Sequence, residues 1–77
     1  MSVTVKFFSS LRETIGMSES ILDTDNLLTV AEVWSKSTNN ADLPPNTLVA
    51  INMDYVNIDA NVKDGDEIAF FPPISGG

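Results

Sequence analysis

The sequence predicts an α+β domain in which one sheet packs against one main helix. Two observations support this class. Alternation of apolar and polar residues predicts strands near both ends of the chain, and two capping-box motifs predict helices between them. The expected order is a strand, a short helix, a strand, the main helix and then three strands, giving a mixed sheet of about five strands. With 77 residues the chain is one domain, and a domain this small gains stability from a partner.

The first strand is expected from an alternation near the N-terminus, whose apolar positions are Val3, Val5 and Phe7. A period of two predicts that these residues face the core and that Phe8 lies on the opposite face. Ser10 and Glu13 have the spacing of a capping box, which predicts the start of a short helix. Gly16 suits the position after a helix end, so this helix should span Leu11 to Ile15.

The main helix is expected after a weak second strand at residues 19–23. Thr29 and Glu32 form a second capping-box pattern, and the helix should end near Ser37. Three apolar residues then share one helical stripe, namely Val30, Val33 and Trp34. We therefore expect these side chains in the core, with Trp34 as a packing residue.

The C-terminal half should contain a loop and three strands. The loop covers residues 38–47, and strands are expected at Leu48 to Met53 and, after a tight reversal, at Val56 to Ile58. Residues 63–66, Lys-Asp-Gly-Asp, predict a turn because glycine tolerates a positive φ. The last strand should run from Glu67 to Phe71.

Composition excludes several classes of function. The chain has neither cysteine nor histidine, which removes disulfides, a thiolate metal site and the commonest general base. Its net charge of −7 has the wrong sign for binding nucleic acid or an anionic membrane, so a partner should be basic or apolar. No stretch reaches the ~18 apolar residues of a membrane span, and the N-terminus lacks the layout of a signal peptide. We therefore expect a cytoplasmic protein.

Asp64, Asp66 and Glu67 form the one acidic cluster in the sequence. A calcium loop of the EF-hand type needs ligands at about five fixed positions and a closing glutamate, and that spacing is absent. We therefore expect no metal site, but a turn with solvated carboxylates. Serine and threonine hydroxyls are present, but without a histidine none is expected to be an activated nucleophile.

Two large aromatic side chains are expected outside the core. If Ile68 and Phe70 face the core, the alternation points Phe71 outward, as it does Phe8 in the first strand. Because a monomer rarely exposes a contiguous apolar patch, we predict a partner surface near the C-terminus. The alternative is that the helix or a loop covers both rings.

The chain ends in a short tail behind two prolines. Pro72 and Pro73 lack backbone donors, so the sheet must stop at about Phe71. We expect a domain at residues 1–73 and a flexible tail at residues 74–77, Ile-Ser-Gly-Gly. Fully extended, this tail would reach roughly 13–14 Å. The terminal glycines either allow a close approach to another surface or mark a frayed end.

Two stretches carry a resemblance to a known family. Residues 64–77, DGDEIAFFPPISGG, are similar to the C-terminal signature of the small, sulfur-carrying subunit of molybdopterin synthase. Residues 5–16, VKFFSSLRETIG, resemble the N-terminal signature of that family, an apolar strand ending in aromatics and followed by an Arg-Glu pair and a Gly. The two motifs bracket nearly the whole chain. The resemblance implies a ubiquitin-like β-grasp fold with the first and last strands adjacent and parallel in the sheet centre.

The resemblance also implies a function for the C-terminus. The chain would be a sulfur carrier that has no catalytic groups and binds no cofactor. An ATP-dependent activating enzyme would adenylate Gly77, and a sulfur donor would convert it to a thiocarboxylate, while Gly76 lets the tail enter a narrow site. The carrier would dock on the large catalytic subunit, where sulfur passes to a pterin precursor in molybdenum cofactor biosynthesis. The family implies two small and two large subunits.

By the same resemblance, the residues that dock on the partner would be Phe8, Arg12, Tyr55, Phe71, Pro72, Pro73, Ile74 and Ser75. Three alternatives stay open. The same chemistry could serve thiamine synthesis or tRNA thiolation, although the Phe-Phe-Pro-Pro stem favours the molybdopterin branch. The chain could also be a ubiquitin-like modifier joined to protein lysines. Finally, it could be an interaction module whose tail has no role.

Overall fold

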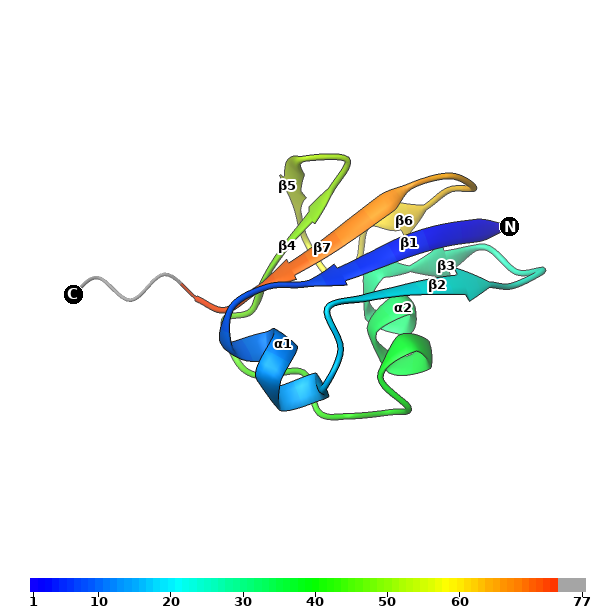
Figure 1. Cartoon of the computed structure of the whole chain (residues 1–77). Helices are drawn as coiled ribbons and strands as arrows, with labels where there is room; N and C mark the ends of the chain where they lie inside the picture. Colours follow the sequence, from blue (N-terminus) through cyan, green and yellow to red (C-terminus); the bar gives the residue numbers. More distant parts are fainter. Residues whose placement is uncertain (74–77) are drawn as a thin grey trace.

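The computed structural model describes residues 1–73, which form a mixed sheet with one helix across a face and another at one end (Figure 1). The elements are β1 (Ser2–Phe7), α1 (Ser10–Ile15), β2 (Glu19–Asp23), β3 (Leu28–Thr29), α2 (Val30–Ser37), β4 (Leu48–Ile51), β5 (Asp54–Val56), β6 (Asn61–Val62) and β7 (Glu67–Phe71). The main sheet has five strands in the order β2-β1-β7-β4-β5. The predicted α+β class and five-stranded mixed sheet are confirmed.

The first and last strands lie side by side in the sheet. β1 and β7 are parallel, with Val5 opposite Ile68 and Phe7 opposite Phe70, whereas the other neighbours in this sheet are antiparallel. The adjacent, parallel arrangement implied by the family resemblance is therefore present. It brings the residues that follow β1 next to the end of β7.

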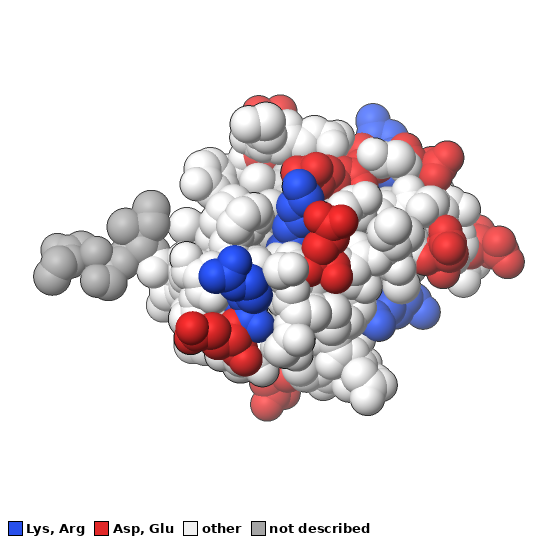
Figure 2. Space-filling model, viewed as in Figure 1, with Lys and Arg blue, Asp and Glu red and all other residues white. Residues whose placement is uncertain are grey.

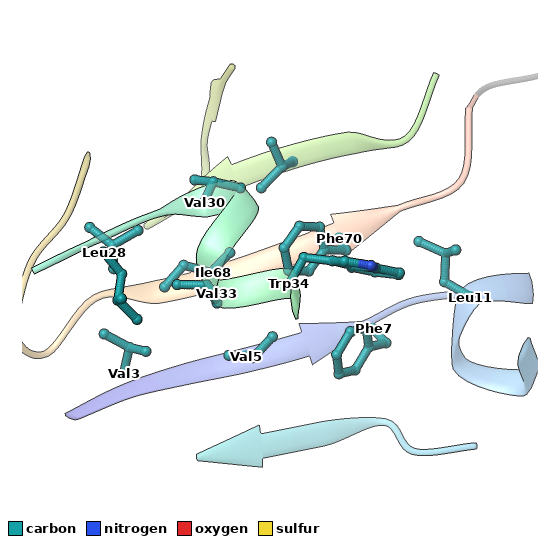
Figure 3. Packing of buried hydrophobic residues seen from close by; sticks show 12 residues of the cluster. Val3, Val5, Phe7, Leu11, Leu28, Val30, Val33, Trp34, Ile68 and Phe70 are labelled. Carbon is teal, nitrogen blue, oxygen red and sulfur yellow. The ribbon is translucent and has the colours of Figure 1, made fainter. Parts of the chain in front are cut away.

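The core fills the space between this sheet and α2 (Figure 3). The inward-facing residues of β1 predicted from the alternation are at most 2% exposed, namely Val3, Val5 and Phe7. The ring of Trp34 meets the ring of Phe70 edge-on with centroids 4.9 Å apart, and its Nε1 donates to the carbonyl oxygen of Ala41 at 2.7 Å. The indole therefore packs in the core with its one polar group paired, as a buried Trp requires.

The predicted capping box at the start of α2 is confirmed. Thr29 Oγ1 accepts from the backbone N–H of Glu32 at 3.3 Å, and Glu32 Oε1 accepts from the backbone N–H of Thr29 at 2.9 Å. Two donors that a helix start leaves unpaired are thereby satisfied. The helix ends at Ser37, where the sequence predicted it.

The short helix α1 begins differently from the prediction. Phe8 O accepts the N–H of Leu11 at 3.1 Å, and the capping residue is Ser9, which has a φ of 53° and makes no side-chain cap. The predicted capping box at Ser10 is wrong because Ser10 already lies within the first turn. Gly16 ends the helix in the left-handed conformation with a φ of 86°, as predicted.

The hairpin after β4 also differs from the prediction. β4 ends at Ile51 rather than Met53, because Asn52 and Met53 form a two-residue turn with φ values of 50° and 74°. Two left-handed residues in succession are typical of a type I′ hairpin. The next strand therefore begins at Asp54, not at Val56.

A second sheet of two strands was not predicted. It pairs Leu28 with Val62 and Thr29 with Asn61. Strands of two residues are too short to show an alternation in sequence. Leu28 and Val62 are nevertheless at most 3% exposed, so this pair contributes two side chains to the core.

The turn before β7 has Gly65 at a φ of 84°, as predicted, but the expectation of solvated carboxylates is wrong at Asp66. Asp66 is 8% exposed, and its carboxylate accepts from Lys63 N at 2.8 Å and from Asn52 Nδ2 at 2.9 Å. Asn52 Oδ1 in turn accepts from Glu67 N at 3.0 Å. These hydrogen bonds connect the β4–β5 hairpin to the start of β7, and they satisfy the carboxylate of Asp66 in its buried position.

Candidate functional site

Three aromatic side chains, Phe8, Phe71 and Tyr55, form a row on the face of the sheet opposite α2; we call them the aromatic row. The rings of Phe8 and Phe71 stack with centroids 4.8 Å apart and planes 9° apart, and the ring of Tyr55 lies 6.3 Å from that of Phe71. Phe8 is 39% and Tyr55 69% exposed, while Phe71 is half-buried. The prediction that Phe8 and Phe71 point outward is confirmed, and no helix or loop within residues 1–73 covers Phe8.

The backbone explains why these residues meet. Phe8 N donates to Phe70 O at 3.1 Å, so the parallel pairing continues one residue past β1 and places Phe8 beside Phe71. On the other side, Tyr55 pairs with Ala50, which also pairs with Ala69. The small alanine side chains leave room between the tyrosine and Phe71. The three rings of the aromatic row therefore meet because of the register in which β1, β7, β4 and β5 pair.

A groove of about 310 Å³ runs beside the row and is lined by Ser9, Leu48, Tyr55, Phe71, Pro72 and Pro73. Its lining is apolar except for one hydroxyl and one phenol. The two prolines, predicted to bind the partner, lie at the point where β7 ends. A second groove of about 420 Å³ is lined by residues 47–49 and 55–59, so Tyr55 and Leu48 border both.

Leu48 and Ser9 were not predicted as site residues. Leu48 lies opposite Phe71 in the neighbouring strand. Its outward direction could have been read from the sequence, because Val49 and Ile51 occupy the alternate, inward positions of the same strand. Nothing in the sequence pattern could have assigned Ser9, whose position depends on its left-handed backbone.

Arg12, the remaining docking residue predicted within the domain, is exposed on α1. This helix starts at Ser10, two residues after Phe8, at the end of the sheet where β7 ends (Figure 1). Within residues 1–73 the one ion pair joins Lys6 Nζ and Glu67 Oε2 at 3.4 Å, so the guanidinium of Arg12 has no carboxylate partner there. Figure 2 shows a basic side chain with an acidic one below it close to where β7 ends, and mostly uncharged surface above them.

The predicted sites at Ile74, Ser75, Gly76 and Gly77 lie outside the described residues and stay predictions. So does the division into a domain and a tail. In the described part, the aromatic row offers apolar contact area but no acid–base pair. No group of three or more His, Cys, Asp or Glu side chains within residues 1–73 could hold a metal ion. None of the helices in that range is long and apolar enough to cross a membrane.

Comparison with known sequences places the chain among relatives of similar length. The model of the ThiS family matches residues 5–77. The molybdopterin synthase sulfur carrier subunit of Haemophilus influenzae is 36% identical, over 97% of this chain and 99% of that protein. The subunit of the same name from Escherichia coli is 30% identical with the same coverage.

Solved structures share the fold. SAMP1 from Haloferax volcanii superposes with a TM-score of 0.83 at 26% identity over the whole of both chains. A chain from the complex of subunits 1 and 2 of the molybdopterin-converting factor from Helicobacter pylori has a TM-score of 0.67 at 23% identity, again over both whole chains. The ubiquitin-like β-grasp fold is thereby confirmed. The chain belongs to the ThiS family and is homologous over nearly its whole length to sulfur carrier subunits of molybdopterin synthase.

Proposed function

We propose that this chain is the sulfur carrier subunit of a molybdopterin synthase and that its chemistry takes place on the carboxylate of Gly77. The names of the full-length relatives support this reading. The carrier supplies the sulfur and the docking surface, and its partners supply the catalysis. Because activation consumes ATP, the proposal includes a cytoplasmic location.

A carboxylate must be activated before it can accept sulfur, because its oxygen is a poor leaving group. An ATP-dependent activating enzyme would join Gly77 to AMP with release of pyrophosphate. Sulfide-level sulfur from a donor acting through that enzyme would then attack the acyl carbon and displace AMP, which leaves a C-terminal thiocarboxylate. ATP is used by the enzyme and is not bound by the carrier. The glycines at 76 and 77 would let the chain end pass through narrow clefts without side-chain clashes.

One observation carries the docking part of the proposal: the aromatic row lies beside Pro72 and Pro73, directly before the tail. A large subunit bound over Phe8, Phe71 and Tyr55 would therefore have Gly77 within roughly 13–14 Å of Pro73. The sulfur would be delivered to a pterin precursor in a pocket of that subunit. The Helicobacter pylori relative comes from a complex of subunits 1 and 2 of the molybdopterin-converting factor, which supports docking on a second subunit.

A second candidate function is conjugation to protein lysines. It is favoured by the structural likeness to SAMP1, small archaeal modifier protein 1, with a TM-score of 0.83. Both functions begin with the same adenylation, but they differ in the acceptor. A lysine-linked conjugate of this chain isolated from cells would favour the modifier function, and a thiocarboxylate without conjugates would favour the synthase.

The proposal is tested by ATP–pyrophosphate exchange with the purified activating enzyme. The chain ending at Gly77 should support exchange, and the same chain with one alanine added after Gly77 should not, because it no longer presents the glycine carboxylate. An internal substitution far from the tail, Leu27→Ala, is the matched control and should exchange normally. Equal exchange by the extended chain would contradict activation at Gly77.

A further inference from the structure

Within residues 1–73, the strand β2 is an edge of the main sheet and pairs on one side only. It runs antiparallel to β1 over five residue pairs, from Glu19 opposite Lys6 to Asp23 opposite Ser2. The opposite edge strand, β5, is three residues long, so β2 is the longer free edge. A free edge exposes a row of backbone donors and acceptors that can pair with another chain.

The alternation of hydrogen bonds along β2 shows which of its residues point their backbone N–H and C=O groups to the free edge. Ser18 O accepts from the N–H of β1 residue Phe7 at 3.0 Å, and Thr24 N donates to the carbonyl oxygen of Met1 at 2.9 Å. Bonded and non-bonded pairs alternate in an antiparallel ladder, so the even-numbered residues of β2 face β1. The residues whose backbone groups point to the open edge are therefore Glu19, Ile21 and Asp23. None of them takes part in the hydrogen bonds made outside the strand ladders within residues 1–73.

The side chains of these three residues lie on the outer face in an acidic–apolar–acidic order. Ile21 is 65% exposed, and Glu19 and Asp23 are exposed as well. Although Lys6 stands opposite Glu19, its ammonium group is paired with Glu67. Neither carboxylate of β2 has an ion-pair partner in the part of the chain that the structure describes.

The charges on β2 indicate what kind of chain can pair with its free edge. Natural edges are often blocked by Lys or Pro, and β2 contains neither. A second copy of this chain, paired antiparallel about Ile21, would oppose each Glu19 to an Asp23. Like charges in direct opposition destabilise such pairing, and each copy carries a net charge of −7. A partner strand with basic residues opposite Glu19 and Asp23 would be attracted instead.

We infer that the free edge of β2 is a docking site for an extended segment of a partner protein with a basic–x–apolar–x–basic pattern. The segment adds a sixth strand to the sheet. Its backbone bonds to Glu19, Ile21 and Asp23, its two basic side chains face the two carboxylates, and its apolar side chain packs on Ile21. β1 lies between this edge and β7, so the docking site on β2 does not include residues of the aromatic row.

The inference is tested with the full chain and a capped peptide, Thr-Lys-Thr-Val-Thr-Lys-Thr, followed by amide NMR. The peptide should shift the amides of Glu19, Ile21 and Asp23 more than those of the aromatic row. A peptide with glutamate in place of lysine should bind at least roughly tenfold more weakly. Ile21→Pro removes an edge donor that the fold does not use and should weaken binding by roughly tenfold. Ile21→Thr, which keeps that donor, should weaken it less.

Charge reversal provides a test that does not depend on Ile21→Pro folding. The double variant Glu19→Lys, Asp23→Lys should no longer bind the lysine peptide and should bind the glutamate peptide. Equal binding of both peptides by the unaltered chain would overturn the inference, as would absence of binding at millimolar peptide. ATP–pyrophosphate exchange with the activating enzyme should be normal in all these variants. A failure of the docking inference is therefore distinguishable from a failure of the sulfur-carrier proposal.

Discussion

The ring of Phe8 stacks on the ring of Phe71, with centroids 4.8 Å apart and planes 9° apart. One residue follows the first strand and the other ends the last strand, and the parallel register of these two central strands brings them together. Pro72 follows immediately. A partner that covers this pair therefore also lies beside the start of the tail.

Phe71→Ala should weaken docking on the large synthase subunit by at least about 30-fold, because it removes the central ring of the aromatic row and a hot-spot aromatic contributes about 2 kcal/mol or more. Affinity is measured by titration calorimetry, with circular dichroism to verify the fold. Leu27→Ala is the control, since Leu27 is 81% exposed but lies outside the row. An unchanged affinity of folded Phe71→Ala would show that the row is not the docking surface.

Asp66→Ala should lower the free energy of unfolding by about 2–4 kcal/mol, since it leaves the N–H of Lys63 and the amide of Asn52 without their acceptor. For a domain of this size, each kcal/mol corresponds to about 4–8 °C in Tm. Asp64→Ala is the control: its carboxylate accepts one bond, from the exposed backbone N–H of Ser2, and its loss should cost about 1 kcal/mol or less. Equal losses in the two variants would refute the role given to the buried carboxylate.

The coupling between Asn52 and Asp66 can be measured separately. A double-mutant cycle with Asn52→Ala and Asp66→Ala should give an interaction energy of about 1 kcal/mol or more, because the two side chains are bonded to each other at 2.9 Å. Additive effects of the two substitutions would mean that this bond contributes nothing to stability.

Met53→Gly should raise the free energy of unfolding by about 0.5–1 kcal/mol. Met53 has a φ of 74° in the second turn position and is 91% exposed, so glycine relieves backbone strain without loss of packing. Met53→Ala keeps the strain and should stay within about 0.5 kcal/mol of the original chain. Urea denaturation distinguishes the two. A Met53→Gly protein no more stable than Met53→Ala would rule out strain at this turn.

Sequence patterns predicted the parts of this fold that depend on local periodicity and capping. The alternation at Val3, Val5 and Phe7 located β1, and Thr29 with Glu32 located the start of α2. The hairpin was misplaced because its boundaries depend on two left-handed residues, and Met53 gives no sign of that conformation. Asp66 was misjudged because its burial depends on Asn52, which is distant in sequence.

In the candidate site too, local patterns predicted some features, whereas others depend on residues that are distant in sequence. Outward directions of Phe8 and Phe71 follow from alternation, but their stacking depends on the parallel register of β1 and β7, which no local pattern encodes. Tyr55 was expected at the row from the family resemblance alone, and its strand and its neighbour Ala50 became apparent only in the structure.

The most direct test of the sulfur-carrier account is the intact mass of the protein purified from cells that contain its pathway enzymes. Replacement of one carboxylate oxygen by sulfur adds about 16 Da at the C-terminus. Since methionine oxidation adds the same mass and the chain has three methionines, thiol-specific alkylation must locate the change, and without cysteine only the terminus can react. We expect an alkylated C-terminal fragment that disappears when Gly77 is deleted. An unmodified C-terminus in the presence of the activating enzyme, ATP and a sulfur donor would contradict the account.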